Sequence, residues 1–257
     1  MLGTAIVGAD TSTRSGWWKL LSALPILAYI SVAALAGEID DCANAHDPDD
    51  AMTGCTAIID STWATDDQLA MAYNNRANAH GLRGRPEAAI ADYSRALALS
   101  PEYGNARYNR ASLYLDLGKF DLAIADFDSV IALAPTRTDA LNNRALALLK
   151  AERYDEAVRG FSDAIRVDPT NALAFNNRGV AWRRKNEVAR AIADFSKAID
   201  LHPEYTGALN NRGEMYVVMG RLDQAAADFR RVLAIDPNHV AADRNLRAVI
   251  DGRSVRK

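Results

Sequence analysis

Apolar side chains recur along most of this chain at steps of three and four residues, and short polar links interrupt the pattern. Leu141 and Ala145 share one such stripe, and Ala157 and Phe161 share the next. This spacing places side chains on one face of an α-helix. The polar link between the two stripes, residues 151–153, is long enough only for a tight turn. The pattern therefore predicts two helices joined as a hairpin.

The hairpin pattern occurs five times with a period of 34 residues. Two columns fix this period, the prolines Pro101, Pro135, Pro169, Pro203 and Pro237 and the aromatics Tyr93, Phe127, Phe161, Phe195 and Phe229. Proline lacks a backbone N–H and crowds the preceding turn, so it ends the second helix of each copy. Self-similarity at this period predicts a repeat array, in which each hairpin buries its apolar faces against its neighbours.

The columns resemble those of the tetratricopeptide repeat (TPR) family. The resemblance rests on a small residue in the first helix (Ala77, Ala111, Ala145, Gly179, Gly213), an alanine in the second (Ala89, Ala123, Ala157, Ala191, Ala225), and the aromatic and proline columns. It covers Ala70 to about His239 and implies an all-α, right-handed superhelical solenoid of helix-turn-helix units. The family's glycine between the helices is replaced by Glu152 and Asn186 in two copies, which concerns only the turns.

The columns also divide the chain. Five TPR units are predicted at 70–103, 104–137, 138–171, 172–205 and 206–239, with a degenerate half repeat at 37–67 and a C-terminal capping helix and tail at 240–257. In the half repeat we expect Asp47 to cap a helix whose first residue is Pro48, since aspartate accepts from free N–H groups and proline tolerates the first turn.

Residues 1–36 differ from the rest of the chain. Arg14 and Lys19 precede an uncharged run, 20–37, in which Ala34 and Ala36 form a small-x-small site. These features predict a secretory signal peptide that is cleaved after Ala36. The alternative is a retained transmembrane anchor, because a run of this length can about span the hydrocarbon core. Either way, we expect the remainder to be exported, periplasmic or otherwise extracytoplasmic.

The only two cysteines, Cys42 and Cys55, follow this run closely. A pair of cysteines in an exported protein predicts a disulfide, which here would staple the half repeat. The alternative is two small buried thiols. We expect no metal site, since no histidine or second cysteine pair lies at ligand spacing.

Composition and motifs argue against nucleic-acid binding and catalysis. The formal net charge is −3, and basic residues are interspersed with acidic ones rather than gathered in a block. The chain has no Gly-rich phosphate loop, no G-x-S-x-G and no H-E-x-x-H. We therefore expect no enzyme and no cofactor; an unrecognised enzyme remains the third interpretation.

A column of asparagines carries the main binding hypothesis. It consists of Asn75, Asn109, Asn143, Asn177 and Asn211, next to a second column of Asn74, Tyr108, Asn142, Asn176 and Asn210. In the TPR family the first helices line the concave groove, which implies that both columns face it. An amide donates and accepts at once, so the column suits an extended peptide backbone. The alternative is that the amides only join adjacent helices.

Residues that vary between repeats are expected to carry specificity. By the resemblance, Tyr108, Lys150, Arg183 and Arg184 fall on groove positions, and the three cations suit an acidic side chain or a carboxylate. The alternative is that these cations are ordinary solvated surface charges. The family's clamp for chaperone C-terminal carboxylates requires basic residues where this chain has Asn74, Asp139 and Asn143, so that ligand is not expected.

A repeated arginine is interpreted as structural. Arg76, Arg110, Arg144, Arg178 and Arg212 recur without exception, and Asp92, Asp126, Asp194 and Asp228 recur sixteen residues later, with Gly160 as the gap. A guanidinium prefers a fixed carboxylate, so Arg76, Arg110, Arg178 and Arg212 are predicted to form ion pairs with these aspartates.

Together these features predict a non-catalytic scaffold or adaptor that binds a protein or peptide partner in the groove. The alternative is a scaffold tethered to a membrane through residues 20–37 that docks partners on its convex face.

Overall fold

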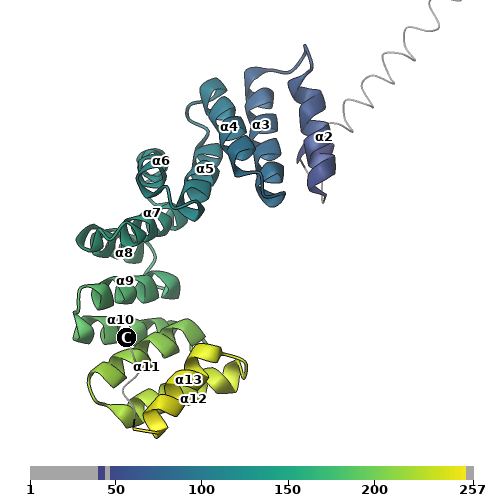
Figure 1. The fold of residues 1–257 in the computed structure, drawn as a ribbon. Coiled ribbons are helices and arrows are strands. Elements are labelled where there is room, and N and C mark those ends of the chain that lie inside the picture. Colours follow the sequence, from purple (N-terminus) through teal and green to yellow (C-terminus); the bar gives the residue numbers. More distant parts are fainter. Residues whose placement is uncertain (1–39, 44–46, 253–257) are drawn as a thin grey trace, which may run out of the picture. The chain divides into compact units, whose positions relative to one another are not determined.

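The structure, a computed structural model, describes residues 40–43 and 47–252, and every regular element within them is an α-helix (Figure 1). The helices are α2 (Pro48–Ile59), α3 (Asp66–Leu82), α4 (Pro86–Leu99), α5 (Gly104–Asp116), α6 (Phe120–Leu133), α7 (Thr138–Lys150), α8 (Tyr154–Val167), α9 (Ala172–Arg184), α10 (Val188–Leu201), α11 (Thr206–Val218), α12 (Leu222–Ile235) and α13 (Val240–Ile250). The predicted all-α architecture of helix-turn-helix units is confirmed. The chain divides into two compact units after Ser100, and each is described separately.

The first unit contains α2, α3 and α4. As predicted, Asp47 caps α2 by accepting from the backbone N–H of Asp49. The predicted disulfide between Cys42 and Cys55 is present and buried, so it fastens the segment before α2 to α2 itself. Helix α3 begins at Asp66, ahead of the predicted repeat boundary at residue 70, because Thr65 and Gln68 form a capping box there.

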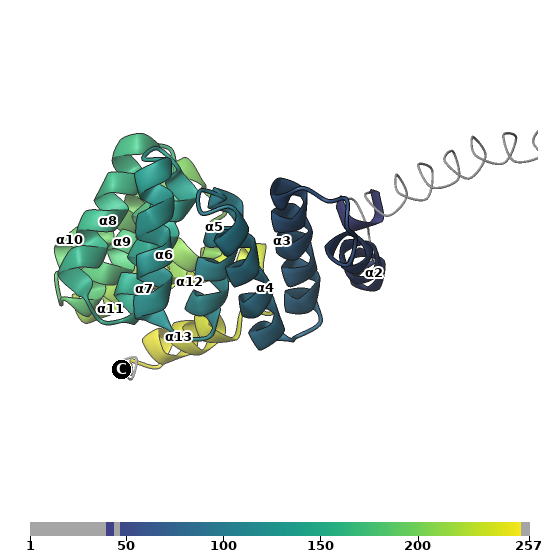
Figure 2. The ribbon, with the colours of Figure 1, turned by 90° about the horizontal axis from the view of Figure 1, so that it is seen from above.

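In the second unit, α5 to α12 form four consecutive hairpins, and each helix packs on the next (Figures 1 and 2). The last helix, α13, packs on α12 and also contacts α11. Each hairpin ends at the residue before its proline, as at Ala134 and His202, which cap α6 and α10. The proline column therefore acts as the helix terminator that its chemistry requires.

A buried phenyl ring stands at the centre of every hairpin of the second unit. Phe127, Phe161, Phe195 and Phe229 are all fully buried. Burying such a ring contributes about 2–3 kcal/mol each relative to exposure. The facing residue on the first helix must be small: a Cβ at Gly179 would lie 2.6 Å from the ring of Phe195, and one at Gly213 would lie 2.6 Å from that of Phe229. This contact explains why these two positions of the small-residue column hold glycine.

The turns between paired helices require a left-handed residue. Gly118 and Gly220 adopt φ near +70°, which glycine accepts without strain. Glu152 (φ 60) and Asn186 (φ 61) adopt the same conformation with a side chain. This conformation costs a residue with a Cβ about 1–2 kcal/mol, and it costs asparagine less than glutamate. The two replacements noted in the sequence are therefore sites of local backbone strain.

The predicted signal peptide or anchor, residues 1–36, lies outside the described residues. Among the helices that the structure describes, none combines the length and apolar character needed to span a bilayer.

Replacing Glu152 with glycine is expected to raise the free energy of unfolding by about 1 kcal/mol, because it removes the left-handed strain. Urea denaturation of the full chain measures the change. The matched control is Glu152→Ala, which keeps a Cβ in the same conformation and should bring no gain. An equal gain from both substitutions would show that the glutamate side chain, rather than the backbone, is the cause.

The first unit has a tyrosine, Tyr93, at the position where each hairpin of the second unit has phenylalanine. Tyr93 is 5% exposed, and its hydroxyl donates to Oδ1 of Asn78 at 2.5 Å. Burial raises the pKa of Tyr93 to about 12. Because the folded state holds this proton more tightly than the unfolded chain does, its contribution to stability is complete below pH 10 and is lost as the pH rises toward 12.

Between pH 9 and 11 the wild type should therefore lose about 1 kcal/mol more stability than Tyr93→Phe. Urea denaturation at each pH measures the difference, and phenylalanine is the residue that the other repeats use. Parallel curves for the two proteins would contradict a buried, protonated tyrosine.

Candidate functional site

The predicted asparagine column lies on the first helix of each hairpin, where its side chains connect neighbouring repeats. In the second unit, Asn177 donates to Oδ1 of Asn142 at 3.4 Å, and Asn211 donates to Oδ1 of Asn176 at 3.0 Å. In both cases the acceptor belongs to the preceding repeat. The two asparagine columns thus bond to each other in a regular ladder.

Tyr108 occupies the acceptor position of this ladder in the second repeat. Its hydroxyl accepts from Nδ2 of Asn143 at 2.9 Å, and the guanidinium of Arg137 lies 4.2 Å from its ring centroid. Asn109 lies half-buried beside it on α5. The hydroxyl of Tyr108 therefore replaces an asparagine oxygen as the acceptor in the ladder, because a phenol hydroxyl can accept a hydrogen bond as an amide oxygen does.

The first unit uses the same position to hold the disulfide segment. Asn75 donates to the backbone oxygen of Cys42 at 3.1 Å and accepts from Nδ2 of Asn74 at 3.0 Å. This bond takes the place of the contact to a preceding repeat. The disulfide thus attaches Cys42 to α2, and the amide attaches it to α3.

A sixth amide, Asn245 on α13, was not among the predicted residues. It lies 34 positions after Asn211, and this spacing was the signal that could have identified it. Its Nδ2 lies 3.5 Å from Oδ1 of Asn210 and 3.5 Å from Oε1 of Glu214, and only 1% of the residue is exposed. The capping helix thus carries the ladder to its end.

These bonds bear on the two interpretations of the column. Each amide has two N–H groups and one oxygen, and joining the repeats uses one N–H. The side chains of Asn143, Asn177 and Asn211 remain partly exposed. The geometry therefore shows the structural bonds and leaves hydrogen-bonding capacity for a ligand.

The repeated arginine, on the first helix of a hairpin, forms two hydrogen bonds with an aspartate on the second helix. Its Nε and Nη2 donate to both oxygens of the aspartate sixteen residues later, and the pairs are Arg76–Asp92, Arg110–Asp126, Arg178–Asp194 and Arg212–Asp228, at 2.7–3.1 Å. Hydrogen bonding to the paired aspartate raises the pKa of Arg76, Arg110 and Arg212 above the usual range. The guanidinium thus stays charged at every practical pH.

The remaining guanidinium nitrogen, Nη1, donates to the preceding repeat. Nη1 of Arg178 donates to Ser162 at 3.0 Å, and Nη1 of Arg212 donates to Ser196 at 3.1 Å. Each serine lies sixteen residues before its arginine. One side chain therefore ties together the two helices of its own hairpin and the last helix of the hairpin before it.

Arg144 has a different partner. Gly160 stands where its aspartate would be, and a Cβ there would lie 2.8 Å from the Cβ of Ala145, so a side chain is excluded. Instead Arg144 donates to Asp128, which occupies the serine position sixteen residues earlier. The carboxylate has moved from one side of the arginine to the other, a substitution that the sequence analysis missed.

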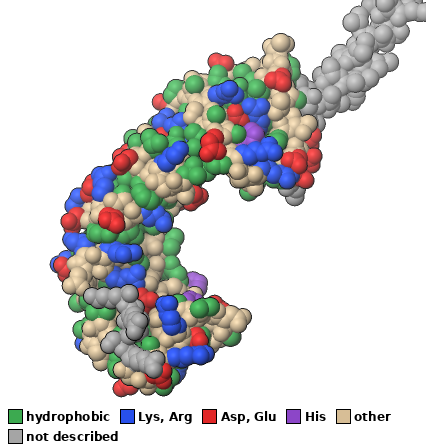
Figure 3. Space-filling view, in the orientation of Figure 1, with side chains coloured by type: hydrophobic (Ala, Val, Ile, Leu, Met, Phe, Trp, Pro, Cys, Tyr) green, Lys and Arg blue, Asp and Glu red, His purple; other side chains and the backbone are tan. Residues whose placement is uncertain are grey.

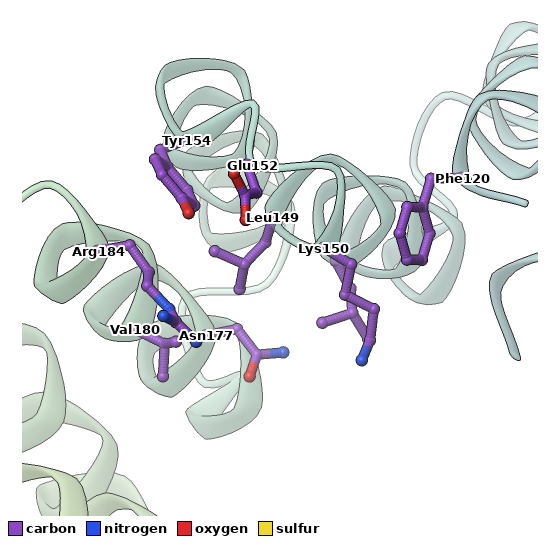
Figure 4. Close-up of a pocket in the computed structure, with 9 residues that line it drawn as sticks. Phe120, Leu149, Lys150, Glu152, Tyr154, Asn177, Val180 and Arg184 are labelled. Carbon is purple, nitrogen blue, oxygen red and sulfur yellow. The ribbon is translucent and has the colours of Figure 1, made fainter. Parts of the chain in front are cut away.

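A cavity of about 430 Å³ lies beside the ends of α7 and α9 (Figure 4). We call it the α7–α9 cavity. Lys150, Asn177 and Arg184 line it together with Glu152, and Leu149 and Val180 form part of its apolar wall. The structure thus brings three of the predicted binding residues into one site.

The charges of this cavity are only partly compensated. Lys150 and Arg184 are exposed and make no ion pair within residues 40–43 and 47–252. Glu152, whose backbone is strained, contributes one negative charge to the same lining. On the face drawn in Figure 3, acidic and basic side chains are mixed.

Two other predicted residues lie apart from the α7–α9 cavity. Arg183 forms an ion pair with Glu214 on α11, so its charge is already balanced. Tyr108 belongs to the amide ladder on α5. In the part of the chain that the structure describes, no group of three His, Cys, Asp or Glu side chains is placed to hold a metal ion.

Comparisons with known proteins agree with this geometry. Profiles described as tetratricopeptide repeat match residues 74–138, 142–206 and 207–239. No curated protein matches the chain in sequence.

Several solved structures share the fold. The MamA fragment 41-end of Desulfovibrio magneticus RS-1 is 25% identical, with a TM-score of 0.61, and the match covers 66% of this chain and 96% of that one. YrrB, described as a TPR protein with an unusual peptide-binding site, is 21% identical, with a TM-score of 0.58 and coverage of 74% and 96%. A thermophilic TPR protein of Thermus thermophilus is 23% identical, with a TM-score of 0.57 and coverage of 70% and 98%.

The two kinds of arginine contact should differ in strength. Asp194, whose side chain is 8% exposed, accepts two bonds, whereas the Asp128 side chain is 52% exposed. Asp194→Asn should lower the free energy of unfolding by about 3 kcal/mol, since it leaves a guanidinium without its buried partner. Asp128→Asn should cost less than about 1 kcal/mol, as exposed pairs do. Urea denaturation compares the two variants, and equal losses would contradict the assigned roles.

Proposed function

The chain belongs to the tetratricopeptide repeat family, and we propose that it is a non-catalytic scaffold or adaptor that binds an extended peptide segment of a partner protein. The peptide lies across the first helices of the second unit and places an acidic group in the α7–α9 cavity.

The excess positive charge of the α7–α9 cavity carries this proposal. Lys150 and Arg184 line it without a carboxylate partner in the described part of the chain, whereas Arg183 and Lys185 nearby are each paired. A carboxylate entering the cavity gains charge-assisted hydrogen bonds, which contribute roughly 1.5–3 kcal/mol each. The cavity therefore favours an acidic ligand over a neutral one.

The amide of Asn177 supports a peptide as the carrier of that acid. One of its N–H groups bonds to Asn142, and the other is available beside the two cations. Asn143 and Asn211 offer partly exposed amides in the flanking repeats. Amides at regular intervals suit a chain with regularly spaced carbonyl groups. YrrB, which shares the fold, is described as having a peptide-binding site.

We further propose that the protein acts outside the cytoplasm. The disulfide of Cys42 and Cys55 supports this location, because such bonds persist in oxidising compartments. The apolar run at 20–37, with Arg14 and Lys19 before it, supports export by a signal peptide or retention by an anchor.

Selection of displayed random twelve-residue peptides against the purified full chain tests the proposal. Peptides that bind wild type should bind Lys150→Glu/Arg184→Glu at least about tenfold more weakly, because both cations are reversed. Fluorescence polarisation measures the dissociation constants.

The matched control is Lys197→Glu/Arg230→Glu, which makes the same charge changes at exposed positions on α10 and α12. It should bind like wild type. A control that weakens binding as much would show that overall charge, not the cavity, controls affinity. Failure of every peptide to bind wild type would refute the peptide-binding function.

A further inference from the structure

A second and larger cavity, of about 800 Å³, lies between the α9–α10 turn, α11 and α13. We call it the α11–α13 cavity. It shares Arg184 with the α7–α9 cavity and adds Arg183, Glu214, Arg244 and Asn245 to its polar lining. Two of these residues, Arg244 and Asn245, belong to α13, so the capping helix forms part of the cavity wall.

The lining of this cavity has an excess of positive charge. Arg183 is paired with Glu214, whereas Arg184 and Arg244 have no ion-pair partner among the described residues. Arg244 is exposed on α13, so its guanidinium is free to reorient toward a ligand. Two uncompensated guanidiniums at one cavity favour a carboxylate, which accepts from their planar forks.

A buried acceptor in the same lining has no donor. Oδ1 of Asn245 is buried and without a hydrogen-bond partner, whereas its Nδ2 faces Oδ1 of Asn210 and Oε1 of Glu214. The amide cannot be reversed, because its oxygen would then face those two acceptors. A buried acceptor without a donor is unfavourable, because the oxygen has lost its hydrogen bonds to water and gained none in return. A ligand N–H that reached this oxygen would replace the lost hydrogen bond.

The remaining wall of the cavity is apolar. Met215, Val217 and Val218 on α11 line it, with Val188 at the start of α10. Val218 is 57% exposed, so its side chain is available for contact with a ligand. The strained turn residue Asn186 lines this cavity, just as the strained Glu152 lines the other one. Strained residues of this kind concentrate at binding sites.

We propose that the α11–α13 cavity binds an acidic side chain and a neighbouring aliphatic side chain of the same extended peptide. The carboxylate pairs with Arg244 and Arg184, the aliphatic group packs on Met215 and Val218, and a peptide N–H donates to Asn245 Oδ1. This assignment rests on the proposed peptide-binding function and adds the class of sequence that the peptide must contain.

At least one of the bound acids is a side chain rather than a chain terminus. Lys150 lies at one cavity and Arg244 at the other, and Arg184 lines both. A peptide that occupies both cavities must therefore supply two carboxylates. A chain has only one C-terminus, so at least one of the two comes from Asp or Glu, and the same ligand chemistry serves both sites.

Peptides from the selection described above, synthesised with a C-terminal amide, test this assignment on the full chain. The bound sequences should contain Asp or Glu beside Val, Leu, Ile or Met. Replacing that acid with its amide should weaken binding to wild type by about tenfold but leave binding to Arg244→Gln nearly unchanged, since interacting groups are not additive. Val218→Asp should weaken the original peptide by at least about tenfold, because it places a carboxylate in an apolar contact.

The control is Arg230→Gln, an exposed arginine on α12 that lies outside the cavity lining. This inference is overturned if Arg244→Gln binds the peptide as well as Arg230→Gln does and Val218→Asp does not weaken binding. If binding still depends on Lys150 and Arg184 in that case, the proposed function stands. Peptides that bind only with a free C-terminal carboxylate would overturn it as well. If no peptide binds, both proposals fail.

Discussion

The arrangement of the repeats depends on one guanidinium in the first helix of each hairpin. Apolar burial drives the helices together, but it has no direction and tolerates sliding of one helix along another. The bidentate bond from Arg178 to Asp194 fixes the two helices of one hairpin, and the bond from the same arginine to Ser162 fixes the hairpin before it. A planar fork accepts only one geometry for such a set of partners. Because the arginine of every hairpin pairs with a carboxylate, it recurs every 34 residues in the sequence.

The amide ladder occupies the first helices of the hairpins, and the same amides are part of the proposed peptide site. Asparagine is a poor residue for the middle of a helix, so its repeated presence needs a compensating interaction. The bonds from Asn177 to Asn142 and from Asn211 to Asn176 supply that compensation. They also hold each amide in a fixed orientation before any ligand arrives, which lowers the conformational entropy that binding would cost. Structural bonding and ligand binding are therefore compatible uses of one side chain.

The sequence was sufficient for the features that repeat. The helix pairs, the terminating prolines, the cap at Asp47 and the disulfide all follow from local chemistry or from columns that recur, and the structure contains them. The Arg178–Asp194 contact follows from the same periodicity. The repeated features could be predicted because each copy supplies the same evidence independently, and the cap and the disulfide could be predicted from local chemistry alone.

Features that depend on one place in the fold could not be predicted in this way. Arg183 pairs with Glu214, and neither residue belongs to a column that recurs from repeat to repeat. Arg144 binds Asp128 because the contact between Gly160 and Ala145 leaves no room for an aspartate at position 160, and this contact is a property of the packed structure. The unsatisfied oxygen of Asn245 depends on what packs around α13. Both cavities are likewise made by side chains that differ from repeat to repeat, and so no column marks them.

The displaced carboxylate at Asp128 limits how this array can change by gain or loss of whole repeats. Removing residues 138–171 would bring Arg178 between Asp128 and Asp194, with two carboxylates for one cation. Duplicating the same residues would give the second copy of Arg144 a serine on one side and a glycine on the other, and no carboxylate at all. The repeats have equal length and a common fold, yet the third is bound to the order in which it stands. Recombination within such a gene would be tolerated at some repeat boundaries and penalised at others, although all of them look alike in the sequence.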